Sequence, residues 1–153
     1  MSVSGAGTTA YTYNSRGYTA SITLPDGAVV TRTYDNLDRV IQETWSTDGT
    51  SVVTAYGCCG VEQTTSRIGA ITNHEYDENG RMTADIDHFG NRTEYEYDED
   101  GNRTVVRDAL DNETVTAFDL LGRPVLVTYP DGTAESTAYD ALGRQVRRTD
   151  RAG

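Results

Sequence analysis

The sequence predicts an all-β fold, an antiparallel meander or spiral sheet built from seven repeats of about 21 residues with two strands each. A turn that opens with an aromatic residue recurs at intervals of 20 to 22 residues, and a second turn follows each one about fourteen residues later. The runs between turns are six to eight residues long, the length of ordinary strands. No run shows a sustained apolar stripe of helical period, so about fourteen short strands are expected.

The first turn of each repeat starts with Tyr or Phe and ends at the fifth residue with Gly, or once with Asp. Asp in the second place can accept hydrogen bonds from the backbone two residues on, and Gly supplies the positive φ that closes a tight reversal. The seven copies are Tyr13-Asn14-Ser15-Arg16-Gly17, Tyr34-Asp35-Asn36-Leu37-Asp38, Tyr56-Gly57-Cys58-Cys59-Gly60, Tyr76-Asp77-Glu78-Asn79-Gly80, Tyr97-Asp98-Glu99-Asp100-Gly101, Phe118-Asp119-Leu120-Leu121-Gly122 and Tyr139-Asp140-Ala141-Leu142-Gly143. Their regular spacing identifies an internal repeat.

The second turn of each repeat is shorter and more variable. It is rich in Asp, Asn, Pro and Gly, the residues that favour chain reversal. The copies are Pro25-Asp26-Gly27, Asp48-Gly49, Gly69, Phe89-Gly90-Asn91, Asp111-Asn112, Pro130-Asp131-Gly132 and the final Gly153. Each repeat is therefore expected to form two reversals.

The runs between these turns have the character of strands. Residues 91–97 alternate, with Thr93, Tyr95 and Tyr97 on one face and Arg92, Glu94 and Glu96 on the other. Residues 113–118 and 133–139 alternate less cleanly but are β-branched or small. A single continuous sheet is expected.

A conventional two-layer domain is not expected, because Leu, Ile, Val and Phe together make up only about 18% of the chain. In a repeat array, stability comes instead from each unit pairing with the next. We expect the aromatic residue before a turn to lie across the hairpin from the Arg after it, as in Tyr76 with Arg81, Phe118 with Arg123, and Tyr139 with Arg144. All 13 basic residues are Arg and none is Lys. This fits stacking of Arg on Tyr, and it equally fits a biased genome composition.

Charge and composition exclude several classes of partner. The formal net charge of −11 argues against nucleic acid and anionic membrane surfaces, which require a basic footprint. No apolar run of 18 residues is present, so no membrane span is expected, and residues 1–7 lack the basic and apolar stretches of a secretory signal.

Other candidate chemistry in the chain is weak. Residues 96–101 imitate the start of an EF-hand loop, but Arg107 stands where a bidentate Glu is required. Cys58 and Cys59 are interpreted as inert thiols in a variant turn, with a vicinal disulfide, metal binding or intermolecular pairing as alternatives, and His74 and His88 are the only histidines. Glycosylation sequons begin at Asn91, Asn102 and Asn112, two of them in turns that favour Asn anyway.

The pattern Tyr-Asp-x-x-Gly-Arg at a period of about 21 resembles the YD repeat, or Rhs repeat, of bacterial Rhs polymorphic toxins, insecticidal toxin complex shell proteins and teneurins. Asn102 in place of Arg and Asp38 in place of Gly are departures from the pattern. We expect residues 1–10 to be a flexible N-terminal segment and residues 11–153 to be a partial YD-repeat array, open at its C-terminal end. The repeat-defining structural residues are Tyr13, Gly17, Tyr34, Asp35, Arg39, Tyr56, Gly60, Tyr76, Asp77, Gly80, Arg81, Tyr97, Asp98, Gly101, Phe118, Asp119, Gly122, Arg123, Tyr139, Asp140, Gly143 and Arg144.

The resemblance implies a β ribbon that spirals, in full-length relatives, into a hollow shell around a C-terminal toxin or other cargo. Seven repeats would form an arc of such a wall, so further YD repeats and the cargo of a parent protein are the expected partners. In relatives, the resemblance implies, a C-terminal core segment closes the shell and carries a self-cleaving pair of Asp-Pro-x-Gly-like motifs. The Asp-x-x-Gly turns of this chain recur with the repeat and lack that Pro, so no autoprotease is expected.

The leading hypothesis is a non-catalytic structural segment of a toxin-encapsulating shell in a secreted or surface-displayed bacterial protein. No catalytic, cofactor-binding or metal-binding residues are assigned, and no cofactor is expected. The alternative is a stand-alone carbohydrate- or protein-binding repeat module at the cell surface, because Tyr combines an apolar ring with a polar tip. The isolated array is expected to associate through unpaired edge strands.

Overall fold

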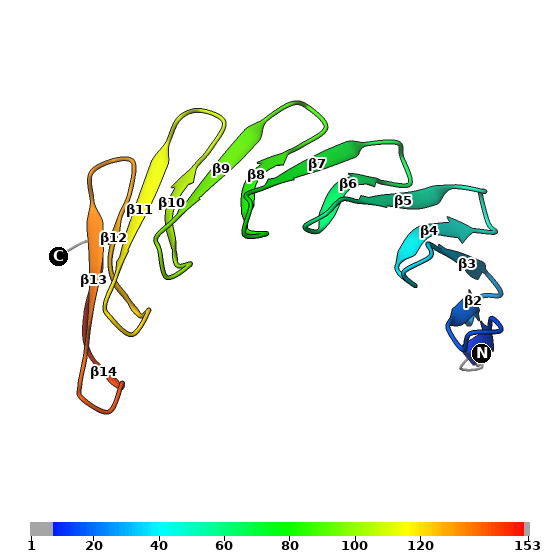
Figure 1. Cartoon of the computed structure of the whole chain (residues 1–153), viewed down its shortest axis with the longest axis horizontal. Helices are drawn as coiled ribbons and strands as arrows, with labels where there is room; N and C mark the ends of the chain where they lie inside the picture. Colours follow the sequence, from blue (N-terminus) through cyan, green and yellow to red (C-terminus); the bar gives the residue numbers. More distant parts are fainter. Residues whose placement is uncertain (1–7, 152–153) are drawn as a thin grey trace, which may run out of the picture. The chain divides into compact units, whose positions relative to one another are not determined.

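The fold predicted from the sequence is confirmed by the computed structural model, which describes residues 8–151 (Figure 1). These residues form fourteen strands and no helix, and the order of the strands in the sheet is their order in the chain. The strands are β1 (Ala10–Tyr13), β2 (Thr19–Thr23), β3 (Val29–Tyr34), β4 (Val40–Trp45), β5 (Ser51–Tyr56), β6 (Val61–Thr65), β7 (Ile71–Tyr76), β8 (Met82–Ile86), β9 (Arg92–Tyr97), β10 (Arg103–Arg107), β11 (Glu113–Phe118), β12 (Pro124–Thr128), β13 (Ala134–Tyr139) and β14 (Gln145–Thr149).

The chain divides into two compact units, one ending at Asn73 and the other beginning at His74. The first unit holds β1 to β6 and the first half of β7. The second holds the rest of β7 and β8 to β14. Within each unit successive strands pair in antiparallel fashion, and Figure 1 shows β9 to β14 following one another in this way.

The two kinds of turn produce different hairpins. Across the turn that follows Phe118, this residue pairs with Pro124 but Ala117 pairs with Leu126, so Val125 is an extra residue in a β-bulge. The same shift occurs in the hairpins β1–β2, β3–β4, β5–β6, β9–β10 and β13–β14. Pairs joined by the second turn, such as β12–β13, have a regular register. Because a bulge increases local twist, the extra twist enters these six repeats on the side of the aromatic turn.

The register between repeats is almost invariant. The residue eight places after each repeat aromatic pairs with the residue three places before the next one. The pairs of this kind are Ser21 with Thr31, Gln42 with Val53, Ala84 with Glu94, Val105 with Val115, and Leu126 with Ser136. After the variant turn at residues 56–61 the register moves by one place, and Gln63 pairs with Asn73.

The described residues have almost no hydrophobic core, as expected. Only Ala28, Val30 and Ala84 among them are buried, and no large side chain is fully buried. Half-buried and exposed residues alternate along strands such as β13, so one face of the strand is better covered than the other. Cohesion must therefore come from contacts between neighbouring strands and turns.

Two sequence predictions concern residues at the ends of the chain that the structure does not describe. Residues 1–7, most of the predicted flexible segment at 1–10, lie outside the described residues, as does Gly153, the last predicted turn signal. The segment at 1–10 therefore stays a prediction. Among the residues that are described, no helix is long and apolar enough to cross a membrane.

Two turns place an Asp where the backbone is left-handed. Asp38 has a φ of 64° and Asp111 a φ of 62°, whereas the equivalent position in most other turns is Gly, for example Gly101 with a φ of 87°. A Cβ at Gly101 would meet no atom within 4 Å, so a substitution there would be opposed by backbone strain alone.

We predict that Asp111→Gly raises the free energy of unfolding by about 0.5–1 kcal/mol and that Gly101→Ala lowers it by about 1–2 kcal/mol, because side chains disfavour the left-handed region. Urea unfolding of the two variants beside the parent chain measures both changes. Equal effects of the same sign would show that backbone strain does not decide the stability of these turns.

Candidate functional site: the contact between successive turns

The recurring polar feature of the structure is an Asp that closes its own turn. In the turn after Tyr76, Asp77 Oδ1 accepts the backbone N–H groups of Asn79 and Arg81, each at 2.9 Å. Its Oδ2 accepts Nε–H of Arg81 at 2.7 Å. The backbone closes too, since Asp77 N–H donates to the Arg81 carbonyl at 2.9 Å and Gly80 N–H to the Asp77 carbonyl at 3.0 Å. We call this arrangement the Asp clamp.

Seven turns within residues 8–151 form an Asp clamp, and the residue four places after the Asp supplies the side-chain donor. That residue is Arg in four turns and Asn in three. The pairs are Asp35–Arg39, Asp77–Arg81, Asp119–Arg123, Asp140–Arg144, Asp87–Asn91, Asp98–Asn102 and Asp108–Asn112. The three sequon Asn residues are thus the clamp donors, each using its side-chain Nδ2–H. In the first turn Asn14 accepts backbone N–H groups in the manner of the Asp.

The clamp lowers the pKa of its carboxyl group. For Asp35, Asp77 and Asp140 the backbone N–H of the Arg four residues on is the largest cause, because it donates to the charged form of the carboxyl. For Asp119 the largest cause of the lowered pKa is the hydrogen bond from the Arg123 side chain. In Asp87, Asp98 and Asp108 the Asn side chain has this leading role.

The clamped Arg contacts the aromatic residue of the next repeat. The guanidinium carbon of Arg39 lies 4.3 Å from the ring centroid of Tyr56, and the same contact occurs between Arg81 and Tyr97 at 4.9 Å and between Arg123 and Tyr139 at 4.5 Å. In these three contacts the clamp therefore orients a cation over the following ring.

This corrects the predicted pairing of Phe118 with Arg123 and of Tyr139 with Arg144 across one hairpin, whereas the pairing of Tyr76 with Arg81 stays a prediction. Phe118 pairs with Pro124 and Tyr139 with Gln145, one residue beyond the Arg in each case. In the bulged turn the Arg side chain donates to the Asp of the same turn, and the guanidinium group then lies over the aromatic ring of the next repeat. Hairpin reasoning that ignored the bulge missed this contact.

The same ring is anchored a second time through its hydroxyl group. Tyr139 O–H donates to the carbonyl of Pro124 at 3.1 Å, fifteen residues earlier. Equivalent bonds run from Tyr34 to Thr19, from Tyr56 to Val40, and from Tyr97 to Met82, with lengths of 2.7 to 3.0 Å. Each of these Tyr side chains thus bridges to the strand that follows the preceding turn of the same kind.

Departures from the motif alter both sides of this contact. In the first repeat Tyr18 stands in the Arg position and its ring lies 5.6 Å from that of Tyr34, so an aromatic pair replaces the cation. Asn102 stands before Phe118, where the cation and the hydroxyl group are both missing. Asp38 forms an ion pair with Arg16 of the preceding turn of this kind.

The turn at residues 56–61 has a different closure. Gly57 replaces the Asp, and its N–H donates to the Gly60 carbonyl at 2.9 Å. A Cβ at Gly57 would overlap the side chain of Glu62, which fills the space where other turns hold their Asp. Cys58 in this turn is exposed and Cys59 is half-buried.

The remaining predicted residues take simple positions in these turns. Tyr13 ends β1, Tyr76 ends β7, and Phe118 ends β11. Positive φ angles of 71° to 87° occur at Gly17, Gly80, Gly101, Gly122 and Gly143. Gly122 and Gly143 also face the preceding turn of the same kind, since a Cβ there would lie 3.1 Å from Asn102 Oδ1 and 3.4 Å from an Arg123 nitrogen, respectively.

The second turns of the repeats have an Arg–aromatic contact of their own, which was not predicted from the sequence. Arg151 lies 4.0 Å from the Tyr129 ring centroid and donates to Asp131 at 2.6 Å and to Thr133 at 3.0 Å. Arg67 repeats the arrangement over Trp45 at 4.4 Å, with donors to Asp48 and Thr50. The sequence pattern that could have predicted this contact is an aromatic residue at the second turn followed by an Arg 22 positions later.

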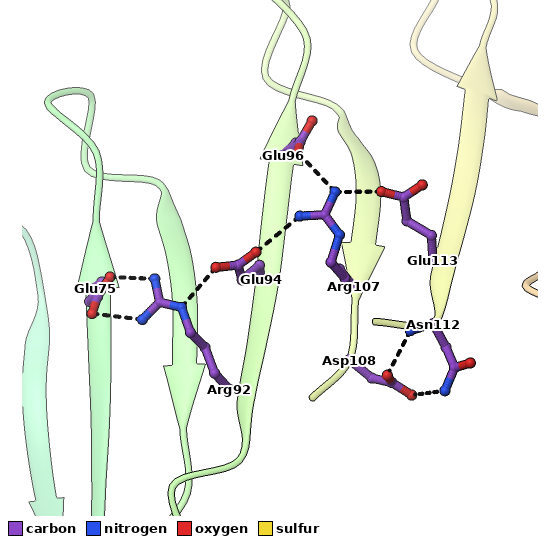
Figure 2. Close-up of polar contacts among 8 residues, drawn as sticks. All are labelled: Glu75, Arg92, Glu94, Glu96, Arg107, Asp108, Asn112 and Glu113. Carbon is purple, nitrogen blue, oxygen red and sulfur yellow. Dashed lines mark hydrogen bonds and ion pairs between the residues drawn. The ribbon is translucent and has the colours of Figure 1, made fainter. Parts of the chain in front are cut away.

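A ladder of charged side chains crosses β7 to β11 on one face (Figure 2). Arg92 donates twice to Glu75, at 2.8 and 2.7 Å, and once to Glu94 at 2.8 Å. Arg107 donates to Glu94 at 3.0 Å and also pairs with Glu113, and lies 3.7 Å from Glu96. The alternation predicted for residues 91–97 places Arg92, Glu94 and Glu96 on this one face.

The contact of Arg92 with Glu75 crosses an intervening strand, and the small residue Ala84 lies there. Arg92 on β9 reaches Glu75 on β7 across β8, and Ala84 of β8, which pairs with Glu94, has 0% exposure. As in the Asp clamps, carboxylates fix the guanidinium groups, here along the strands. Arg92 and Arg107 each contact two or more carboxylates.

The Asp clamps and the charged ladder bind groups of this chain itself: backbone N–H groups, Arg and Asn side chains, and carboxylates. A surface hollow lined by Asn91, Arg92, Glu94, Arg107, Asp108 and Asp111 contains mainly groups that the clamps and the ladder already bind. His74 Nδ1 lies 3.2 Å from Asp85, and the ring of His88 contacts that of Phe89 at a tilt of 41°. Within residues 8–151 no group of three or more His, Cys, Asp or Glu side chains could hold a metal ion.

Comparison with known proteins identifies a repeat family. Residues 76–113 and 118–153 match the RHS Repeat family. No curated protein sequence matches the chain.

Solved structures share the fold. A Tc holotoxin pore of Photorhabdus luminescens matches 92% of this chain at 16% identity with a TM-score of 0.77. TcdB2-TccC3 without its hypervariable C-terminal region matches 92% at 16% identity with a TM-score of 0.78, and TcdB2-TccC3-Cdc42 matches 94% at 16% identity with a TM-score of 0.77. This chain spans 9% of each matched chain.

We predict that Arg123→Ala lowers the free energy of unfolding by about 1 kcal/mol, because both the clamp donor for Asp119 and the cation over Tyr139 are lost. Arg147→Ala, at an exposed position of β14, serves as the control and is expected to change it by less than about 0.5 kcal/mol. Urea unfolding measures both. An equal effect of the two substitutions would contradict a specific role for Arg123.

We also predict that stability falls with acid. The pKa values of the clamp Asp residues are lower in the folded chain than in the unfolded chain, so the unfolded chain binds protons first. The stabilisation is complete above the ordinary Asp pKa of about 3.9 and is lost as pH falls through the lower folded values. Unfolding at pH 7, 5 and 3 should show the loss below pH 5. A free energy of unfolding that is constant between pH 5 and 3 would exclude it.

Proposed function

This chain belongs to the YD-repeat (Rhs-repeat) family, and we propose that it is a non-catalytic structural segment of an RHS-repeat shell that encloses a toxin or other cargo. The parent protein would be a bacterial protein that is secreted or displayed at the cell surface, and further YD repeats and the cargo would be its partners. The Arg-to-Tyr contact between successive repeats is the observation that carries the proposal.

A wall needs cohesion that does not depend on a central core. In this chain successive repeats are joined by paired strands, and at Tyr56, Tyr97 and Tyr139 the junction also has a stacked cation and a Tyr hydroxyl bond, all of them local. Such contacts can be repeated without limit, and an array gains stability with each neighbour that is added. The similarity of fold to Tc toxin structures supports a role of this kind.

The state of the carboxyl groups supports a role without catalysis. A general acid at neutral pH needs a raised pKa in a cleft, and the clamp lowers the pKa of Asp35, Asp77 and Asp119 instead. In the charged ladder, Arg92 and Arg107 bind the glutamates that could otherwise act as a pair.

The test is to express the whole reading frame that contains this sequence and to image the product by electron microscopy. We expect a closed hollow particle whose C-terminal segment resists added protease. A matched variant with Arg81→Ala and Arg123→Ala weakens two repeat contacts and should release that segment to the protease sooner. An open ribbon with a readily cleaved C-terminal segment would contradict the shell.

A glycan array probed with the 153-residue chain tests the alternative of a stand-alone binding module. Binding above background, together with a reading frame that lacks further repeats, would favour that alternative over the shell.

A further inference from the structure

We propose that Cys58 and Cys59 form a redox site, which exchanges with disulfides of other molecules and closes to a disulfide between the two neighbouring residues. The co-reactant is a low-molecular-weight or protein disulfide. The chain contains two cysteines, and they stand side by side in the turn between β5 and β6. The site needs only this turn, so it stands or falls independently of whether the parent protein encloses cargo.

The turn that carries the two thiols is one residue shorter than the other bulged turns. Tyr56 pairs with Val61, five positions later, whereas the same spacing in the other bulged turns is six. The backbone closes through Gly57 N–H, which donates to the Gly60 carbonyl at 2.9 Å. The two cysteines are therefore the central residues of a two-residue loop.

Closure of this loop does not explain why both central residues are cysteine. Two-residue loops favour turns with a positive φ at one or both central residues, which Gly, Asn or Asp supplies. Within residues 8–151 the residues other than Gly with a positive φ are Asp38 and Asp111, so neither cysteine has one. The tips of other aromatic turns hold residues as different as Glu99 and Leu121. The pair of thiols therefore calls for a reason other than the shape of the turn.

The two thiols differ in their access to solvent. Cys58 is exposed and Cys59 is half-buried, and both side chains are thiols in this structure. An exposed thiol can reach a disulfide on another molecule, whereas burial shelters its neighbour. Redox-sensing cysteines have this arrangement, in which an accessible thiol lies next to a resolving one. Cys58 is therefore assigned the first attack and Cys59 the second.

The exchange takes place in two steps. The Cys58 thiolate attacks one sulfur of the external disulfide, so a mixed disulfide forms, the external S–S bond breaks and a first thiolate leaves. Cys59 then gives its proton to solvent, and its thiolate attacks the Cys58 sulfur and releases a second thiolate. Together the two cysteines lose two electrons and two protons. The external disulfide takes up both electrons and both protons and becomes two thiols.

The disulfide formed in this way is expected to be easily reduced. Neighbouring Cα atoms are about 3.8 Å apart across a trans peptide. Disulfides normally join Cα atoms about 4.4–6.8 Å apart, and bonds outside this range are strained and more reducible. Gly57 and Gly60 flank the pair, so the backbone on each side can adjust as the ring closes. The site therefore cycles between two states and is not a permanent staple.

The surroundings of the loop favour this reaction over metal binding or pairing between chains. A closed zinc site needs four ligands, and in the part of the chain that the structure describes no cluster of three or more His, Cys, Asp or Glu side chains is suited to a metal ion. Pairing with another chain competes poorly, because the neighbouring thiol is in the same loop and has a far higher effective concentration.

Treatment of the 153-residue chain with oxidised glutathione tests the site. Remaining thiols are then alkylated, and the intact mass reports thiols, adducts and dimers. We expect the parent chain to lose two hydrogen atoms without a lasting glutathione adduct. Cys59→Ser should retain glutathione on Cys58 at a level at least about tenfold above the parent, because the second attack is lost. The double variant Cys58→Ser, Cys59→Ser is the control and should keep its mass.

Reduced glutathione, added after this reaction, should restore both thiols of the parent chain, because structural disulfides resist this reductant and strained ones do not. A parent chain that keeps both thiols in oxidised glutathione, retains the adduct or forms disulfide-linked dimers would overturn the proposal. A ring that survives reduced glutathione would overturn its reversibility.

The rates of the two single variants test the order of attack. In the folded chain Cys59→Ser, which keeps the exposed thiol, should react with oxidised glutathione about three- to tenfold faster than Cys58→Ser, which keeps the half-buried one. In urea, where burial is lost, the two rates should become similar. Equal rates in the folded chain, or a difference that persists unchanged in urea, would contradict the assignment of Cys58 as the attacking thiol.

Discussion

A charged carboxylate that accepts the N–H groups of its own turn is the interaction on which this structure depends. The chain reverses about every ten residues, and each reversal leaves backbone groups that no strand can satisfy. Asp77 satisfies two of these with one oxygen and holds Arg81 with the other. The Arg81 guanidinium also donates to the Asp98 carbonyl at 3.0 Å. Together these bonds hold the cation over Tyr97.

The consequence is a sheet whose order is local. Pairing, stacking and hydroxyl bonds all connect one repeat to the next, and the described residues bury only Ala28, Val30 and Ala84. In such an array stability is a sum of repeat and interface contributions, so a lost contact weakens one interface and leaves the others intact. That tolerance explains how the contact can be missing between Asn102 and Phe118 while the strand register there stays the same. The same independence suits a wall of repeats better than a site that must converge on one substrate.

Much of this could be predicted from sequence because it is encoded locally. The spacing of Tyr34, Tyr97 and Tyr139 and the alternation along residues 91–97 depend on turn chemistry and strand period alone. The direction of the Arg side chain could not be predicted in this way. It depends on a bulge that shifts the register by one residue at aromatic turns such as those after Phe118 and Tyr139, and hairpin pairing rules assume no such shift. The contact of Arg151 with Tyr129 was missed for a related reason, since its partners are 22 residues apart and meet only once strands are paired.

The central claim is that neighbouring repeats are energetically coupled through the clamped Arg and the following Tyr. A double-mutant cycle of Arg81→Ala and Tyr97→Leu in urea unfolding measures that coupling directly. We expect a coupling energy of about 0.5–1 kcal/mol for this pair and additive effects for Arg81→Ala with Tyr139→Leu, which lie in different contacts. Additive effects for Arg81 and Tyr97 as well would contradict the account.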